Sequence, residues 1–144
     1  MLRSKQVIVL NAESTTNAAT ASGNIDTLGY DALQLDVIMT TSDDTTNNPT
    51  VLKLSESDDT VVSNFSNISG AVGDTDFTIA DAVTSGNWGM RFNVDDLTGR
   101  KRYIKLSISP LTTQVISAIA TLYKADEGPI TAANAGVKNL VDVG

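Results

Sequence analysis

Two residue types are missing from this 144-residue sequence, which contains no cysteine and no histidine. Without cysteine the chain can form no disulfide, no thiolate metal site and no cysteine nucleophile. Without histidine it lacks the commonest general base, the usual zinc ligand and the usual pH switch near neutrality. Together the two absences argue against most enzyme classes, so we expect a protein without catalytic activity and without a cofactor.

Aromatic residues and basic residues are also scarce. Aromatics make up 5% of the chain, so Val, Ile, Leu and Ala must fill most of the core. Ten Lys and Arg stand against 17 Asp and Glu, which gives a net charge of -7. Nucleic acids and anionic membranes repel such a chain unless its basic residues cluster. We therefore expect neither a nucleic-acid partner nor a membrane partner.

Long hydrophobic runs are absent as well. No apolar run approaches the ~18 residues that span a bilayer. The apolar run 7–10, near the start of the sequence, is too short for the core of a signal peptide. We therefore expect the chain to be made and folded in a cytoplasm.

What the sequence does contain is alternation of apolar and polar residues, which is typical of strands with one buried face. The clearest case is 88–94, where Trp88, Met90, Phe92 and Val94 share one face. We place 11–23 in a loop or an irregular strand, and one helical turn at 80–86. The predicted strands are 5–12, 24–28, 31–41, 50–57, 76–79, 88–94, 103–109 and 114–123, with a further strand and loop within 61–73.

Turn residues separate these segments. The polar stretch 41–50 contains Asn, Asp and Pro, "DDLTG" at 95–99 predicts a hairpin loop with Gly99 at positive φ, and Pro110 ends a strand. Many short strands with regular turns and no amphipathic helix predict an all-β fold, a single β-sandwich of about seven to nine antiparallel strands. Its topology is expected to be jelly-roll-like, and an Ig-like topology is the alternative. We expect one domain, 1–144, in which 1–23 holds an N-terminal arm and the first strand, and 130–144 forms an extended C-terminal arm.

Some strands carry more specific expectations. The run 7–10 is apolar at every position, so this strand is either buried on both faces or packed at a junction. In 50–57 and 103–109, leucines and isoleucines face inward, whereas Lys53, Ser55, Lys105 and Ser107 face outward.

The segment 114–123 is predicted to be the longest strand, and both of its faces are partly apolar. Such a strand lies in the centre of a sandwich or against another subunit. We therefore predict a subunit contact at Val115, Ile119 and Tyr123. The cluster Arg100, Lys101 and Arg102 is either a solvated strand start opposite Asp95 and Asp96, or a contact with a phosphate or an acidic neighbouring subunit.

Acidic pairs in turns raise the question of a metal site. Two such loops at one end of a sandwich could bind Ca²⁺ through carboxylate oxygens, although no EF-hand spacing is present. The simpler interpretation is turn chemistry, because Asp caps turns with its own side chain. The weak calcium candidates are Asp43, Asp44, Asp58, Asp59, Asp95 and Asp96, and a further pair, Asp74 and Asp76, is placed in a turn.

The sequence gives little support to a catalytic or a sugar-binding function. A glycosidase needs two facing carboxylates, and Asp36 with Glu56 is the pair that lies in strand-like runs. Lys105 and Ser107 alternate on a polar face without a Ser–Lys catalytic motif. Trp88 could stack on a sugar, but its phase with Phe92 places it in the core.

Three segments, taken in order, carry a resemblance to a known family. They are "YDALQLDVIM" at 30–39, "TVLKLSESDD" at 50–59, and "RYIKLSIS" followed by a turn and "VISAIATLYKADEGPIT" at 102–131. In this order they resemble small virion structural proteins of tailed bacteriophages, especially head decoration (cement) proteins. The likeness covers roughly residues 25–130 and is one of strand texture, so no binding residue carries over from it.

The resemblance implies a role as well as a fold. It implies a non-enzymatic module on the capsid surface of a virion, which binds the major capsid protein and forms a homotrimer that stabilises the head shell. Two alternatives stay open. One is a tail or neck component of the virion, and the other is a carbohydrate-binding β-sandwich, with or without Ca²⁺ in its Asp-rich loops.

Overall fold

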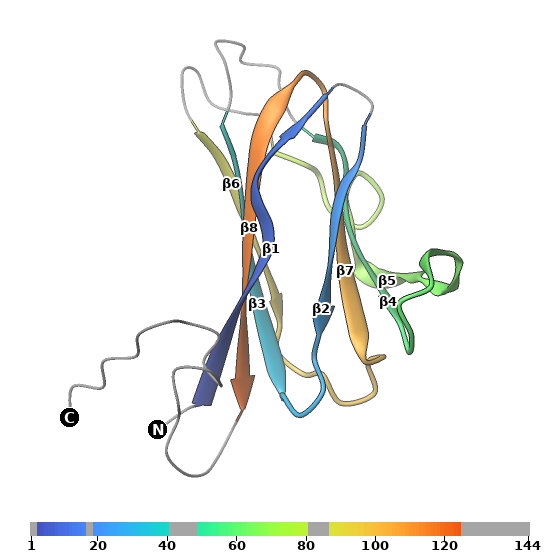
Figure 1. Ribbon diagram of the computed structural model, residues 1–144. Coiled ribbons are helices and arrows are strands. Elements are labelled where there is room, and N and C mark those ends of the chain that lie inside the picture. Colours follow the sequence, from blue (N-terminus) through green and yellow to red (C-terminus); the bar gives the residue numbers. More distant parts are fainter. Residues whose placement is uncertain (1–2, 17–18, 41–48, 81–86, 125–144) are drawn as a thin grey trace, which may run out of the picture.

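The computed structural model describes residues 3–16, 19–40, 49–80 and 87–124. Strands account for most of these residues, and the described part also contains one short 3-10 helix (Figure 1). The elements are β1 (Arg3–Thr15), β2 (Ala21–Asp26), β3 (Ala32–Thr40), β4 (Pro49–Ser57), η1 (Val62–Asn64), β5 (Ser66–Val72), β6 (Asn87–Val94), β7 (Tyr103–Pro110) and β8 (Gln114–Lys124). The all-β class and the expected number of strands are confirmed.

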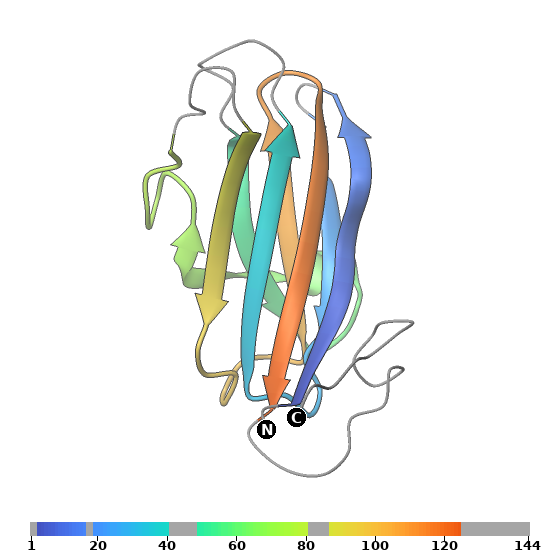
Figure 2. The ribbon, with the colours of Figure 1, turned by 90° about the vertical axis from the view of Figure 1, so that its left-hand side faces the viewer.

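The strands form two antiparallel sheets that pack face to face (Figures 1 and 2). Sheet I has the order β1-β8-β3-β6, and sheet II has the order β2-β7-β4-β5. The pairs are nested, because β1 lies beside β8, β2 beside β7, β3 beside β6 and β4 beside β5. This nested pairing, divided between two sheets, is the eight-stranded jelly roll, so the predicted topology is confirmed.

The core lies between the two sheets and follows from period-two alternation. Leu35 and Val37 of β3 face Leu106 and other inward side chains of sheet II, and all three are fully buried. Burying one such side chain stabilises the fold by about 1.5–3 kcal/mol. The other fully buried large side chains are Ile25, Leu33, Met39, Leu52, Leu54, Ile104, Ile108, Ile116 and Leu122.

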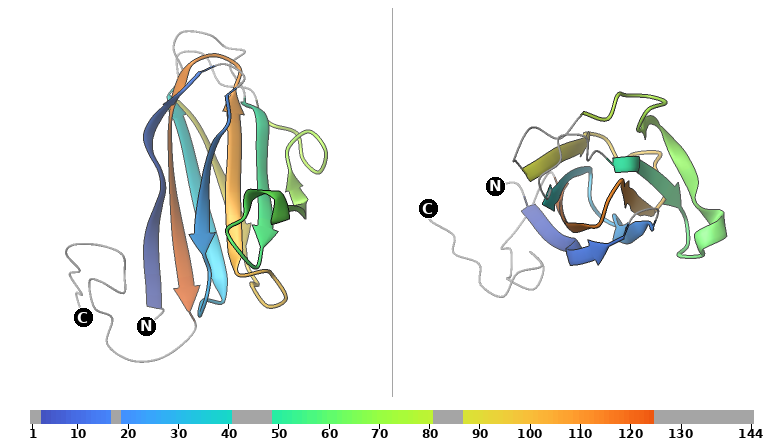
Figure 3. Two further views of the ribbon diagram at one scale, coloured as in Figure 1. Left: turned by 45° about the vertical axis from the view of Figure 1, so that its right-hand side comes forward. Right: turned by 90° about the horizontal axis from the view of Figure 1, so that it is seen from above.

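The two long sides of the sandwich are closed differently (Figure 3). On one side β1 lies next to β2, so closely that a Cβ added to Gly23 would stand 2.5 Å from the carbonyl oxygen of Val9. On the other side the segment 73–80 covers the gap between β5 and β6. There Phe77 packs edge-on against Phe92 with ring centroids 5.9 Å apart, and the indole N–H of Trp88 donates to the carbonyl oxygen of Ala80 (2.8 Å).

The first strand is confirmed, but it is not buried on both faces. Leu10 is buried, whereas Ile8 is 67% exposed and Val7 and Val9 are half-buried. The reason is that β1 is an edge strand of sheet I and meets β2 at the junction between the sheets. Packing at a junction, the other alternative from the sequence, is therefore correct.

Three local predictions are wrong. The loop 95–99 is not a hairpin, because β6 and β7 belong to different sheets, although Gly99 does have positive φ (81°). The segment 76–79 forms only an isolated bridge, from Phe77 to Gly73. β8, with 11 residues, is shorter than the 13-residue β1, because β1 continues through bulges past the apolar run.

Two predicted outward serines are hidden from solvent. Ser55 and Ser107 do lie on the outer face of sheet II, but they are only 3% and 7% exposed. Larger neighbours on that face cover them: Lys53 and Lys105 lie beside them, and the Lys105 ammonium stands 4.2 Å above the ring of Phe65. The predicted helical turn at 80–86, most of the turn 41–50 and the C-terminal arm at 130–144 lie outside the described residues.

Candidate functional site: the outer face of sheet I

Sheet I presents a broad, nearly uncharged face to solvent, shown face on in Figure 2. Every second residue of its four strands points outward, and the strand registers place these residues in rows across the sheet. They are Ser4, Gln6, Ile8 and Ser14 of β1; Val115, Ser117, Ile119, Thr121 and Tyr123 of β8; Ala32, Gln34, Asp36, Ile38 and Thr40 of β3; and Gly89, Arg91 and Asn93 of β6.

Four large apolar side chains stand exposed on this face. The exposed fractions are 67% for Ile8, 50% for Ile38, 42% for Ile119 and 39% for Val115. Ile8 is directly opposite Ile119 in the register, and Ile38 lies diagonally between Ile119 and Val115. Side chains in such positions touch or nearly touch, so the four form one apolar patch in the middle of the sheet.

One ion pair accompanies the patch. The Arg91 guanidinium donates to both carboxylate oxygens of Asp36, at 2.5 and 3.1 Å, and the Gln34 amide donates to Asp36 at 3.3 Å. The hydrogen bond from Arg91 lowers the pKa of Asp36 and raises that of Arg91, against the opposing effect of partial burial. Among the described residues of this outer face, these two are the charged ones, so their charges cancel.

A shallow hollow of about 650 Å³ lies beside the patch. Gly89, which contributes no side chain, and Ser117 are among the residues that line it. Ile38 and Ile119 form an apolar part of its wall, and the Asp36–Arg91 pair forms a charged part. The remaining lining residues are Gln6, Val37, Met90 and Thr121.

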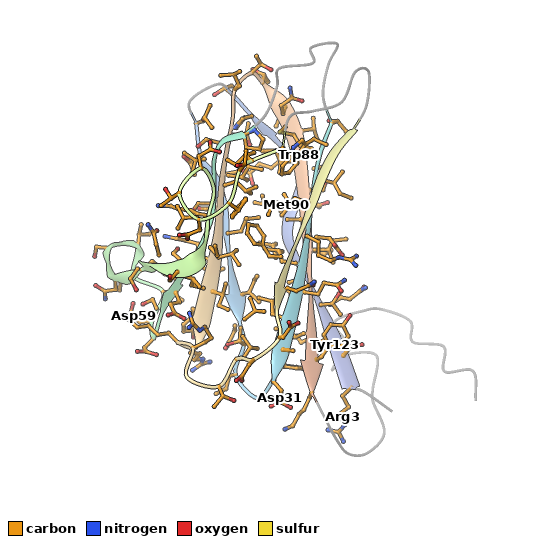
Figure 4. The ribbon with its side chains drawn as sticks, turned by 180° about the vertical axis from the view of Figure 1, so that it is seen from behind. Arg3, Asp31, Asp59, Trp88, Met90 and Tyr123 are labelled. Atoms are coloured by element: carbon orange, nitrogen blue, oxygen red, sulfur yellow. The ribbon has the colours of Figure 1, made fainter. Side chains whose placement is uncertain are left out.

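The structure brings together only part of the predicted subunit contact. Val115 and Ile119 lie exposed on this face, and Tyr123 is half-buried at the end of β8, where its carbonyl oxygen accepts from the N–H of Asp31 (2.8 Å; Figure 4). Ile8 and Ile38 belong to the same patch but were not predicted. The strand order, which puts β1 and β3 on either side of β8, was the missing information.

The predicted basic cluster lies elsewhere, at the start of β7 in sheet II. Arg100 pairs with Glu56 (3.5 Å), whose carboxylate also accepts from the backbone N–H of Lys101 (3.1 Å). Arg102 holds Asp26 through two hydrogen bonds (3.0 and 2.7 Å), which lower the pKa of Asp26. The acids that form ion pairs with this cluster are therefore Glu56 and Asp26. Of the two predicted acids, Asp96 also interacts with the cluster, because hydrogen bonds from Thr98 and, to a smaller extent, the charge of Arg100 lower its pKa.

The acidic turns are held by contacts within the chain. Asp59, on the projecting loop in Figure 4, accepts from the side chain of Asn64 (2.8 Å) and the N–H of Val61 (2.9 Å), and these bonds lower its pKa. Asp96 accepts from the N–H of Thr98 (2.7 Å).

These contacts match the turn interpretation, and a calcium role stays a prediction. No three carboxylates converge within the part of the chain that the structure describes. Asp43 and Asp44 lie outside that part. In the third acidic turn, Asp76 accepts from the backbone N–H of Gly70 (2.8 Å) and Val72 (3.0 Å), and Asp74 accepts from that of Ile79 (3.1 Å).

The remaining candidates are dispersed. Asp36 and Glu56 belong to different sheets, and each has its own cationic partner. Trp88 is 4% exposed, which confirms its assignment to the core. A smaller hollow of about 270 Å³, between β5 and β6, was not predicted; Leu54, Ile68 and Phe92 line it, and Asp96 and Arg100 lie at its edge. No helix in the described ranges is long and apolar enough to cross a membrane.

Comparison with known proteins adds one likeness of fold. No family model matches the sequence, and no curated protein matches it. In the solved structure of infectious bursal disease virus Gx strain, a chain matches 85% of this one with a TM-score of 0.52 and 14% identity, and this chain spans 32% of it. At that identity the likeness supports the jelly-roll fold alone.

Two weaker likenesses were found among solved structures. SPBc2 prophage-derived protein YomS matches with a TM-score of 0.48 and 12% identity over 86% of this chain and 96% of its own. A family GH115 4-O-methyl-alpha-glucuronidase matches with a TM-score of 0.36 and 12% identity over 85% of this chain and 16% of its own. At these TM-scores neither carries an argument about function.

Proposed function

We propose that this chain is a non-enzymatic structural protein of a phage virion, a decoration (cement) protein that stabilises the head shell through subunit contacts. Its partners are the major capsid protein and further copies of itself, with the homotrimer as the assembly that the family resemblance favours. Its place is the capsid surface. The observation that carries the proposal is the outer face of sheet I, where four large exposed apolar side chains and one ion pair form a surface suited to contact with another protein.

The composition of that face supports a contact role. Interface cores are depleted in charge and enriched in large apolar side chains relative to the rest of a surface. Sheet I has four exposed large apolar residues and one internally neutralised ion pair, on a chain of net charge -7. A face of this kind exposed to water would promote nonspecific association. Its presence on the surface therefore favours a specific binding partner.

The jelly roll is compatible with a mechanical role. Its sheets place a rigid, hydrogen-bonded surface against a neighbour, and a decoration protein stabilises a shell by binding the assembled state more tightly than the dissociated state. No step of this mechanism requires a general base or a metal. The absence of histidine and cysteine from the chain is therefore compatible with this role.

The test is binding to expanded shells of the major capsid protein of the same virion. We expect saturable binding at a fixed copy number per shell and a higher temperature of shell disruption when the protein is bound. Ile119→Asp places a charge in the apolar patch and should weaken binding at least ten-fold, whereas Asn24→Asp on the opposite sheet should not. Absence of wild-type binding would reject the head location and leave the tail or neck alternative to be tested with those assemblies.

A further inference from the structure

Gly89 has no evident role in the fold of its own chain. It lies inside β6, a position at which glycine weakens a strand. Its φ is not positive, and a Cβ added there would meet nothing closer than the carbonyl oxygen of Val37, at 3.8 Å. The five other glycines in the described residues each have a reason, because Gly29, Gly70 and Gly99 have positive φ, and Gly23 and Gly73 would clash at 2.5 and 2.6 Å.

A glycine inside a strand without such a reason often marks close approach by a ligand or another backbone. Gly89 is exposed and is one of the residues that line the 650 Å³ hollow on the outer face of sheet I. Its missing side chain is part of what makes the hollow. The contact that explains this glycine therefore lies beyond the part of the chain that the structure describes.

The same face carries a projection that matches the hollow. Ile8 is the most exposed of its apolar residues, at 67%, and it lies on β1, one edge strand of sheet I. Gly89 lies on β6, the other edge strand. In the rows across the sheet, Ile8 shares its row with Ile119 and Asp36, and Gly89 lies in the next row, with Ser117 and Ile38.

A two-fold axis lying in the plane of this face would use both features at once, if it passes midway between Ile8 and Gly89 and runs oblique to the strands, because the two residues lie one row apart. It would bring Ile8 of each copy over Gly89 of the other. The projection and the hollow would then meet twice, which is the self-complementarity that a two-fold interface requires.

Charge favours the same partner. Elsewhere the excess of acidic residues opposes the approach of a second copy, since the chain carries a net charge of -7. On the outer face of sheet I, the charges of Asp36 and Arg91 cancel, so this face adds no repulsion of its own when a second copy approaches.

We infer that a second copy of this chain docks on the outer face of sheet I, with Ile8 of each copy seated in the hollow over Gly89 of the other. The inference rests on the proposed function, because it identifies the partner in one of the subunit contacts that this function requires. On the shell this contact joins neighbouring bound copies, which is why a charge placed at Ile119 is expected to weaken shell binding.

The size of the face sets the expected affinity. Four strands about 4.8 Å apart and about eight residues long cover roughly 500 Å² per copy, or about 1,000 Å² in total. That value is at the lower limit for a specific interface, so the isolated dimer is weak. On a shell, the high local concentration of bound copies would raise its occupancy.

The first experiment is sedimentation equilibrium over a wide concentration range. The wild type is expected to show concentration-dependent association through this two-fold contact, which pairs either monomers or the proposed trimers. Gly89→Gln fills the hollow with a neutral side chain that the strand can accommodate, and it should raise the dimer dissociation constant at least ten-fold. The matched control, Asn24→Gln on the outer face of sheet II, should leave that constant unchanged, and thermal melts should show that both variants fold.

The second experiment uses the absence of cysteine from the chain. Mixing Ile8→Cys with Gly89→Cys under mild oxidation should give a disulfide-linked dimer that contains one of each variant. Mixing Asn24→Cys with Gly89→Cys should give far less. Equal cross-linking in the two mixtures, a wild type that stays monomeric at every concentration, or a Gly89→Gln variant that dimerises like the wild type would each overturn the inference.

These outcomes are separable from those of the shell-binding test. A wild type that dimerises through Gly89 but ignores shells supports the inference and rejects the proposed function. A wild type that binds shells but never self-associates does the reverse.

Discussion

The outer faces of the two sheets differ, although both belong to strands with the same alternating pattern. Sheet I exposes Ile8, Ile38, Val115 and Ile119 around one ion pair. The outer face of sheet II carries mainly short hydroxyl and amide side chains with separate charges, namely Ser22, Asn24, Asp26, Lys53, Ser55, Ser57, Tyr103, Lys105, Ser107 and Ser109, together with Val51. Alternation therefore assigns the faces, and the residues at the outward positions distinguish a contact face from a solvated one.

The largest expected difference in stability is between substitutions on the two faces of a single strand. Ile116→Ala empties a fully buried position on β8 and should lower the free energy of unfolding by about 2–5 kcal/mol, because the remaining core cannot close the cavity. Ile119→Ala, three residues further along the same strand, should cost only about 0.5 kcal/mol in the monomer. Urea unfolding at low protein concentration measures both values, and similar losses for the two variants would contradict the assignment of the faces.

Two glycines provide the next comparison, with opposite signs. Gly23→Ala forces a Cβ to within 2.5 Å of the Val9 carbonyl oxygen, where β1 meets β2, and should destabilise the fold by about 1–3 kcal/mol. Gly89→Ala meets no such obstacle and should stabilise the monomer by about 0.4–1 kcal/mol, because it restricts the unfolded chain. Thermal melts of the two variants measure both changes in stability. If Gly89→Ala destabilised the monomer, Gly89 would be required for folding, which would contradict the expectation.

Two serines should also differ, by a smaller amount. On sheet I, Ser117 Oγ accepts from the N–H of Ala12 (3.1 Å), so Ser117→Ala should lower stability by about 0.5–1.5 kcal/mol. On sheet II, Ser55 Oγ is buried and makes no hydrogen bond to any described residue, so Ser55→Ala should be neutral or stabilise by up to about 1 kcal/mol. If Ser55→Ala were clearly destabilising, the Ser55 hydroxyl would have to be hydrogen-bonded in solution.

Most of the fold could be predicted from the sequence, and the errors have a common cause. Alternation identified the long strands, such as 88–94 and 114–123, because a half-buried strand shows its period in a short window. It could not show that β6 and β7 lie in different sheets, since the same turn residues suit a hairpin and a crossing between sheets. It also failed at 76–79, where Phe77 and Ile79 close the side of the sandwich without forming a strand.

The candidate contact face was predictable only in part, for a related reason. Val115 and Ile119 belong to one strand, and the apolar character of both its faces is visible in the sequence. Ile8 and Ile38 join them only through the order β1-β8-β3. The separation of the Arg100–Arg102 cluster from this face also depends on sheet membership, which no local pattern encodes.

The smallest effect concerns pH, and it compares the ion pair of each sheet. The hydrogen bonds from Arg91 and Arg102 lower the pKa values of Asp36 and Asp26 below the ordinary value for aspartate. Each pair therefore adds stability above about pH 4, the ordinary value, and loses it as the pH falls through the lowered pKa. Because both pairs are largely exposed, each should contribute no more than about 0.5–1 kcal/mol.

Asp36→Asn and Asp26→Asn should each reduce the free energy of unfolding slightly at pH 7, and the difference from the wild type should shrink at an acidic pH below the lowered pKa values of the two carboxylates. Urea titrations at the two pH values measure this. Only Asp36→Asn should also change the dimer dissociation constant, because its loss leaves the Arg91 charge uncompensated on the docking face. Equal effects of both variants on dimerisation would mean that net charge, and not the face of sheet I, controls the approach of a second copy.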